Sequence, residues 1–181
     1  GKLLAQCGAE VIRVEPPGGD PIRLAGPFAD DEPDINAGGL HRLLNPGKRS
    51  LVLDIVSKDD IQQLKPLLAS SDLLLASWRT PSALPLNDSD LLHADAPNTT
   101  FVSISEFGRD GPYAEREADS HIIEALAGMS YVGGDPDREP LSAGVEVADY
   151  FAGVLGWIAA LAAIAETRIG HIHHFVDVSI H

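Results

Sequence analysis

The chain is poor in cysteine and in basic residues. Cys7 is the single cysteine among 181 residues, which excludes an internal disulfide and favours a reducing compartment. Lysine and arginine total 13 against 27 acidic residues, giving a formal net charge of -14. This charge argues against nucleic acid or an anionic membrane surface as a partner. We therefore expect a cytoplasmic protein whose partners are small molecules.

Several signature motifs of ligand sites are also missing. No G-x-G-x-x-G or Walker-type loop occurs, so neither a dinucleotide site nor a P-loop is supported. Histidines stand at positions 171, 173, 174 and 181, but no cysteine and no second ligand pair at zinc-like spacing accompanies them. We predict no metal site there, and an exposed turn between a helix and a strand instead.

A long uncharged segment, residues 150–165, follows the carboxylate of Asp149. Its 16 residues fall short of the ~20 that span a bilayer, and Glu166 and Arg168 close it. We predict a buried helix of a soluble protein. Asp149 at its head has two interpretations: an N-cap, as most such residues are, or an ionised and partly desolvated carboxylate that serves as a nucleophile or base. Spacing alone leaves both open.

Strand-like and helix-like segments alternate along the chain without tight hairpin signals. This order predicts an α/β fold, a Rossmann-like parallel sheet flanked by helices. Strands are predicted at 10–15, 50–55, 72–76, 100–105 and 175–180, helices at 2–8, 57–70, 89–94, 120–130 and 150–165, and a long loop at 16–48.

Candidate ligand-binding residues flank three of these strands. Ligands of open parallel sheets bind beyond the carboxyl ends of the strands, where Glu15 and the P-P-G-G-D-P loop follow one strand and Trp78 and Arg79 follow another. Lys48 and Arg49 precede a third strand in the segment N-P-G-K-R-S. The cations could bind phosphate and Trp78 could stack on a base. The alternative is a set of exposed side chains that serve solubility.

Five segments, taken together and in order, resemble the class III coenzyme A transferase family, also called CaiB/BaiF, which includes the 2-methylacyl-CoA racemases. They are L-L-A-Q-C-G-A-E-V-I-R-V-E-P-P-G-G-D-P at 3–21, N-P-G-K-R-S-L-V-L-D-I at 45–55, F-V-S-I-S-E-F-G-R-D-G-P-Y-A at 101–114, V-A-D-Y-F-A-G at 147–153 and F-V-D-V-S-I at 175–180. Each motif is weak alone, but the family order makes the set specific.

The resemblance implies a part of a larger protein. Family members are about twice this length, beyond the usual single-domain range. Residues 1–181 would then be part of the Rossmann-like large domain, without its first strand and without the C-terminal small domain. Members form interlocked homodimers, use acyl-CoA and carboxylate substrates, and need no metal.

The resemblance also implies roles for individual residues. Asp149 falls on the catalytic aspartate, which in the transferases attacks an acyl-CoA thioester to give a mixed anhydride and then an aspartyl-CoA thioester. The coenzyme A site would include Lys48, Arg49 and Arg79, together with Trp78. The loop residues from Glu15 to Pro17 would lie beside the nucleotide.

Departures from the family pattern leave alternatives. Ser77-Trp78-Arg79-Thr80 replaces Asn-Phe-Arg-Pro, and H-I-H-H at 171–174 replaces G-x-G-Q. The racemases place a histidine before the catalytic aspartate to move the α-proton, whereas this chain has Asp119 there and His121 two residues on. We expect a CoA transferase; the alternatives are a 2-methylacyl-CoA racemase or epimerase and a non-catalytic CoA-binding or assembly fragment.

Overall fold

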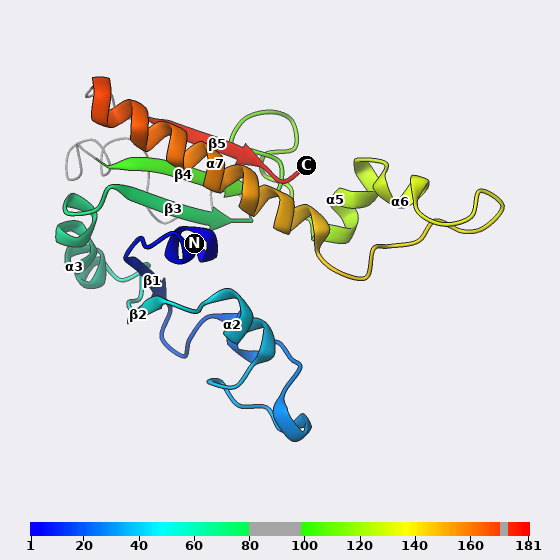
Figure 1. The fold of residues 1–181 in the computed structure, drawn as a ribbon, viewed down its shortest axis with the longest axis horizontal. Coiled ribbons are helices and arrows are strands. Elements are labelled where there is room, and N and C mark those ends of the chain that lie inside the picture. Colours follow the sequence, from blue (N-terminus) through cyan, green and yellow to red (C-terminus); the bar gives the residue numbers. More distant parts are fainter. Residues whose placement is uncertain (80–98, 171–173) are drawn as a thin grey trace. The chain divides into compact units, whose positions relative to one another are not determined.

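The computed structural model describes residues 1–79, 99–170 and 174–181. The chain divides into two compact units, Gly1–Lys65 and Pro66–His181. Each contains a parallel sheet with helices (Figure 1). The α/β prediction is therefore confirmed. The weak helix predicted at 89–94 lies outside the described residues.

The first unit is built on two parallel strands. Its elements are α1 (Lys2–Gln6), β1 (Val11–Glu15), the 3-10 turns η1 (Pro21–Leu24) and η2 (Ala29–Asp31), α2 (Gly39–Leu44), β2 (Lys48–Val52) and the start of α3 (Lys58–Ala69). Val11 stands opposite Lys48 in the register, and Glu15 stands opposite Val52. β2 begins two residues before the predicted strand, so Lys48 and Arg49 belong to the strand itself.

The prediction of one long loop at 16–48 is wrong. The segment contains α2 and two 3-10 turns, and Gly38 at the start of α2 serves close packing. A Cβ on Gly38, just before α2, would lie 2.5 Å from the carbonyl oxygen of Arg23. A side chain would clash there, so glycine lets α2 approach η1.

The second unit has a three-stranded parallel sheet in the order β3-β4-β5. Its elements are β3 (Leu73–Trp78), β4 (Thr100–Ser105), α5 (Ser120–Leu126), α6 (Met129–Val132), α7 (Val147–Gly170) and β5 (Phe175–Ser179). All six residues of β4, the central strand, are buried, as expected of a parallel strand covered on both faces. The helix predicted at 120–130 is interrupted by Gly128, whose φ of 80° ends α5 and starts α6.

Helix α7 packs along β4 and β5 and forms the core of this unit (Figure 1). Ala152 and Ala160 of α7 meet Val102, Ile104 and Val178 of the sheet. Between the alanines, Gly156 lets the helix approach closely, since a Cβ there would lie 2.8 Å from Cδ1 of Ile104. Small residues on one helix face thus set the distance between α7 and the sheet.

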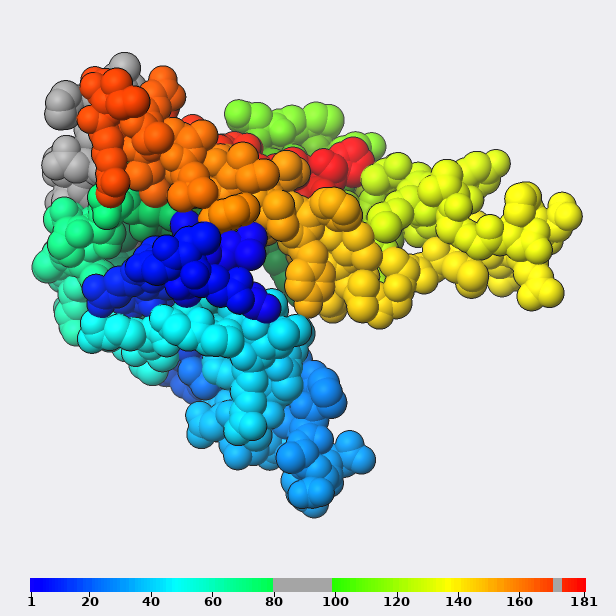
Figure 2. Space-filling view, viewed as in Figure 1, coloured from blue at the N-terminus to red at the C-terminus, as the bar shows by residue number. Residues whose placement is uncertain are grey.

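The prediction that the apolar helix is buried holds for one face alone. Phe151, Leu155 and Ile158 are 66%, 55% and 53% exposed, and the helix forms the orange band in Figure 2. At 24 residues α7 is also longer than the 16-residue run, and by length and composition it could cross a membrane. Core helices of soluble proteins pass the same test, so this is weak evidence for a membrane span.

Candidate active site

Asp149 lies in the first turn of α7, in the second unit. The helix begins at Val147, so Asp149 is its third residue and an N-cap role at this position is wrong. The backbone N–H groups of Val147 and Ala148 instead donate to Oε1 of Glu124, at 3.0 and 3.4 Å. The Asp149 carboxylate remains exposed, and the nearby Ser120 hydroxyl and its own backbone N–H favour its ionised form.

Glu124 of α5 is the buried partner of this helix end. It is 1% exposed, and its Oε1 also accepts a hydrogen bond of 3.1 Å from Oγ of Ser120. Oε2 finds no hydrogen-bond partner in the described part of the chain. Glu124 is not among the residues predicted from the sequence, although its lone charge in the apolar run I-I-E-A-L is a signal that could have indicated it.

Other carboxylates perturb Asp149. Partial desolvation raises the pKa of Asp149, the negative charges of Glu146 and Glu124 add to the rise, and the hydrogen bond from Ser120 opposes it. Burial likewise raises the pKa of Glu106, which follows β4 and accepts a 2.7 Å hydrogen bond from the Ala118 amide. A carboxylate with a raised pKa holds a proton more readily and is a stronger base and nucleophile when ionised.

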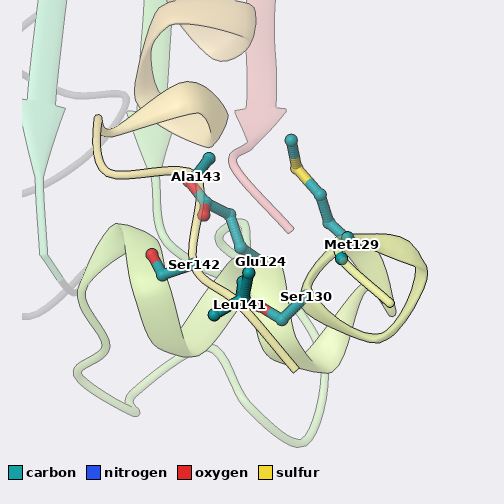
Figure 3. Close-up of a pocket in the computed structure, with 8 residues that line it drawn as sticks. Glu124, Met129, Ser130, Leu141, Ser142 and Ala143 are labelled. Atoms are coloured by element: carbon teal, nitrogen blue, oxygen red, sulfur yellow. The ribbon is translucent and has the colours of Figure 1, made fainter. Parts of the chain in front are cut away.

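A small cavity lies beside Glu124, with a volume of about 220 Å³. Its lining includes Glu124, Met129, Ser130, Leu141, Ser142 and Ala143, shown in Figure 3. Glu124 reaches in from α5, and Ser142 and Ala143 come from the segment that leads into α7 (Figure 3). Asp149 does not line this cavity. The cavity therefore lies next to the buried Glu124 and not next to Asp149.

In the first unit, Glu15 is a structural anion. Its side chain is 2% exposed and accepts hydrogen bonds from Nε and Nη2 of Arg23, at 2.5 and 2.8 Å. Oγ of Ser50 and the backbone N–H of Asp20 complete its shell at 2.8 and 3.1 Å. These donors, with Arg23 first, lower the pKa of Glu15 to about 2. Both oxygens are occupied, so Glu15 can serve a ligand by shaping the loop beside it.

That loop carries Pro17, which is exposed. Gly18 and Gly19 follow with φ of 91° and 88°, a backbone region that favours glycine. The amide of Asp20 then returns to Oε2 of Glu15 and closes the turn. The sequence P-P-G-G-D thus folds into a loop that presents Pro17 to solvent.

Lys48 and Arg49, two of the cations predicted to bind phosphate, do not form a cluster with each other. Lys48 and Arg49 are neighbours in β2, so their side chains point to opposite faces. Nζ of Lys48 donates to Oδ1 of Asn45 at 2.8 Å, and burial lowers the pKa of Lys48. Arg49 pairs with Glu10 at 2.6 Å on the surface, where its side chain is 73% exposed.

Trp78 and Arg79 lie at and just beyond the end of β3, in the second unit. Trp78 is half-buried, and its indole nitrogen is buried without a hydrogen-bond partner among the described residues. Arg79 is exposed and stands 3.6 Å from Glu117. Their unit also contains Asp149, whereas Glu15, Pro17, Lys48 and Arg49 belong to the other unit.

The histidines show no metal-binding arrangement in the described ranges, where no group of three or more His, Cys, Asp or Glu could hold a metal ion. His171 and His173 lie outside those ranges. His174 stands 3.3 Å from Glu166, and His121 is exposed on α5. Asp119, at the position of the racemase histidine, caps α5 by accepting from the Ile122 amide at 2.9 Å.

The fold and site define an α/β protein with parallel sheets and a carboxylate at the head of a core helix. Residues 1–181 match the family "CoA-transferase family III" throughout, and the chain belongs to this family. The family predicted from the five segments is thereby confirmed.

Curated relatives and a solved structure agree with this assignment. Succinate–glutarate CoA-transferase of Agrobacterium fabrum is 33% identical, over 99% of this chain and 46% of the relative. Succinyl-CoA–D-citramalate CoA-transferase of Chloroflexus aurantiacus is 31% identical, over 100% of this chain and 44% of the relative. A CaiB/BaiF family protein from Brucella suis superposes with a TM-score of 0.90 at 31% identity, over 99% of this chain and 48% of that one. The chain spans about half the length of these relatives.

Proposed function

We propose that the protein transfers coenzyme A between carboxylic acids, with Asp149 as the nucleophile of a covalent aspartyl intermediate. The observation that carries this proposal is that Glu124, and not Asp149, accepts hydrogen bonds from the first amides of α7. Glu124 binds the first amides of the helix, so the Asp149 carboxylate is exposed in the first turn and has no capping duty to other residues. A carboxylate placed in this way can act as a nucleophile.

The proposed acyl transfer needs no oxidant or reductant. An oxygen of Asp149 attacks the thioester carbonyl of an acyl-CoA, the C–S bond breaks, and CoA thiolate leaves a mixed anhydride behind. The thiolate attacks the aspartyl carbonyl of the anhydride, which releases the first acid as a carboxylate and forms an aspartyl-CoA thioester. The acceptor carboxylate reverses the same two steps, and Asp149 is regenerated.

Acyl-CoA is bound, in this proposal, by the residues that the family resemblance selects. The ion pairs of Arg49 and Arg79 support this binding mode. Exposed ion pairs such as theirs contribute little to stability, so either arginine can exchange its carboxylate partner for a phosphate. Trp78 would offer an apolar surface to the base, and Pro17 a loop contact. Lys48 would need to leave Asn45, and Glu15 would act by holding the loop.

The substrates are short-chain dicarboxylic acids and their CoA thioesters in our proposal. Support comes from the relatives, two of which are named for succinate or succinyl-CoA. Succinyl-CoA is therefore the donor to test first, with glutarate and citramalate as acceptors. We propose no metal requirement for the reaction.

The direct test traps the intermediate in the full-length protein. The protein is incubated with succinyl-CoA and then with hydroxylamine or borohydride, and the peptide containing Asp149 is examined by mass spectrometry. We expect an adduct that is absent in Asp149→Ala and present in Glu139→Ala, a control at an exposed carboxylate on the loop before α7. Transfer that proceeds normally in Asp149→Ala would contradict the proposal.

A 2-methylacyl-CoA racemase or epimerase is the second candidate. The raised pKa of Asp149 suits proton transfer, and the exposed His121 supplies a second titratable group on α5. Entry of solvent deuterium at the α-carbon of 2-methylacyl-CoA, without an adduct on Asp149, would select this activity. Neither signal, together with measurable CoA binding, would select a non-catalytic CoA-binding or assembly protein.

We propose that the protein is cytoplasmic and works as an interlocked homodimer. The exposed apolar face of α7, with Phe151, Leu155 and Ile158, supports a surface that is covered in the assembly. Light scattering after gel filtration should give twice the mass of one full-length chain. A monomer under conditions of full activity would contradict the dimer.

A further inference from the structure

A buried carboxylate joins α5 to the start of α7. Oε1 of Glu124 accepts from three donors: the Ser120 hydroxyl of its own helix at 3.1 Å, and the amides of Val147 and Ala148 at 3.0 and 3.4 Å. The first amides of a helix have no partner within the helix. Here that partner comes from a residue 23 positions earlier in the chain.

The position of Asp149 depends on these contacts. Asp149 follows Val147 by two residues, so its backbone belongs to the same helical turn whose amides Glu124 holds. Ser120 interacts with both carboxylates: its hydroxyl donates to Oε1 of Glu124 at 3.1 Å, and the same hydroxyl favours the ionised form of Asp149. Two linked contacts thus tie the nucleophile to α5, one through the backbone and one through Ser120.

We propose that Glu124 is a positioning residue for Asp149, fixing the first turn of α7 and, through Ser120, the orientation of the attacking carboxylate. This inference rests on the proposed transferase function and deepens it. Glu124 does not itself touch the substrate in this proposal. It acts on the distance and angle between Asp149 and the thioester, on which rates of such attacks depend strongly.

The alternative is that Glu124 merely stabilises the fold. The glutamine variant separates the two roles, because Oε2 has no partner among the described residues. An amide group can take its place while Oε1 keeps its three donors. Glu124→Gln therefore preserves the geometry and removes the charge, whereas Glu124→Ala removes both.

The charge of Glu124 gives a second readout, the pKa of Asp149, which reports whether the two carboxylates interact. The charged groups around Asp149 are Glu146 just before α7, Glu124 of α5 and Glu106 after β4, with Arg79 near Glu106. Removing the charge of Glu124 should lower the pKa of Asp149. Removing the Ser120 hydroxyl should raise it, since that hydrogen bond favours the ionised form. The two variants thus shift the pKa in opposite directions.

The experiment compares Glu124→Gln, Glu124→Ala and Ser120→Ala with Glu139→Ala as control, all in the full-length protein. Succinyl-CoA transfer gives kcat and KM, NMR gives amide exchange at Val147 and Ala148, and carboxyl NMR gives the pKa of Asp149. We expect Glu124→Ala to lose kcat about 10- to 100-fold with little change in KM, as misplacement of a reacting group does. The amides of Val147 and Ala148 should exchange faster in Glu124→Ala. In Glu124→Gln, kcat and amide exchange should both be close to those of the wild-type protein.

Several results would overturn the proposal. They are a folded Glu124→Ala with unchanged kcat, a Glu124→Gln as slow as Glu124→Ala, or no change in amide exchange. If Glu124→Ala does not fold, Ser120→Ala tests the contact between α5 and Asp149: a lowered kcat with little change in KM supports the proposal, and an unchanged kcat refutes it. If the wild-type protein transfers no CoA, the proposed function fails, while exchange and the Asp149 titration still test the positioning.

Discussion

Replacing Glu15 by glutamine should destabilise the first unit by about 2 kcal/mol at pH 7. The side chain is 2% exposed and its ion pair with Arg23 is the first cause that lowers its pKa from 4.5 to about 2. A fall of that size corresponds to about 3 kcal/mol of stabilisation. The unit around Glu15 is small and solvent lies close by, so screening reduces the expected value to about 2 kcal/mol.

The pH dependence follows from the sign of this change. A pKa that is lower in the folded state stabilises the protein above the unfolded value of 4.5. The contribution is lost as the pH falls from 4.5 towards 2, because protonated Glu15 no longer pairs with Arg23. The difference between the wild-type protein and Glu15→Gln should therefore be full at pH 7 and shrink below pH 4.5.

Hydrogen exchange is the suitable assay. Both tryptophans, Trp78 and Trp157, lie in the second unit, so their fluorescence does not report on the first. Amides of β1 and β2 should exchange about 30-fold faster in Glu15→Gln at pH 7, which is the ratio that 2 kcal/mol gives. Glu10→Gln, which removes an exposed ion pair with Arg49, should change exchange less than about threefold. Equal effects of the two variants would refute the reasoning.

Three further predictions concern the second unit. Gly156→Leu should lower the free energy of unfolding by about 1–3 kcal/mol through overpacking against Ile104, whereas Gly153→Leu, where a Cβ meets open space, should not; denaturant titration checks this. Arg79→Ala should raise KM for succinyl-CoA about tenfold with kcat unchanged, while Arg168→Ala, another exposed arginine beside a carboxylate, should leave both constants as they are. The acid limb of kcat/KM should lie above the ordinary aspartate range, since the pKa of Asp149 is raised; an acid limb at or below that range would contradict its assignment as the nucleophile.

The sequence predicts elements best where local pattern and burial agree. The segment T-F-V-S-I-S was predicted as a strand at 100–105, and β4 has those bounds. The short helix α2 was missed because Gly38 resembles a loop residue, while its reason for being glycine is contact with a carbonyl 15 positions away in sequence. For α7, an apolar composition around the whole helix does not tell which face the sheet covers.

For the candidate site, too, the sequence predicts some features and not others. The family pattern singled out Asp149, but its place as third residue of α7 depends on where the helix starts, and Glu124 determines that from another element. The Glu15 carboxylate was predicted to lie beside a ligand site, and the sequence does not reveal that Arg23, Ser50 and the Asp20 amide bind it. Contacts between residues far apart in sequence leave no local pattern. The sequence therefore indicates Asp149 and Glu15, but it does not indicate their partners Glu124 and Arg23.

Ser120 links the chemistry to the architecture of the helix end. Its hydroxyl has one proton, and two carboxylates, Glu124 and Asp149, lie within its reach. Acylation of Asp149 would remove the negative charge that competes for this proton, so Glu124 would then receive it fully. Ser120 would then donate to Glu124 alone in the acyl-enzyme, and Asp149 would compete for its proton again when the free carboxylate is regenerated. The helix end would therefore stay held by Glu124 throughout the cycle, while the nucleophile is stabilised only in its free form.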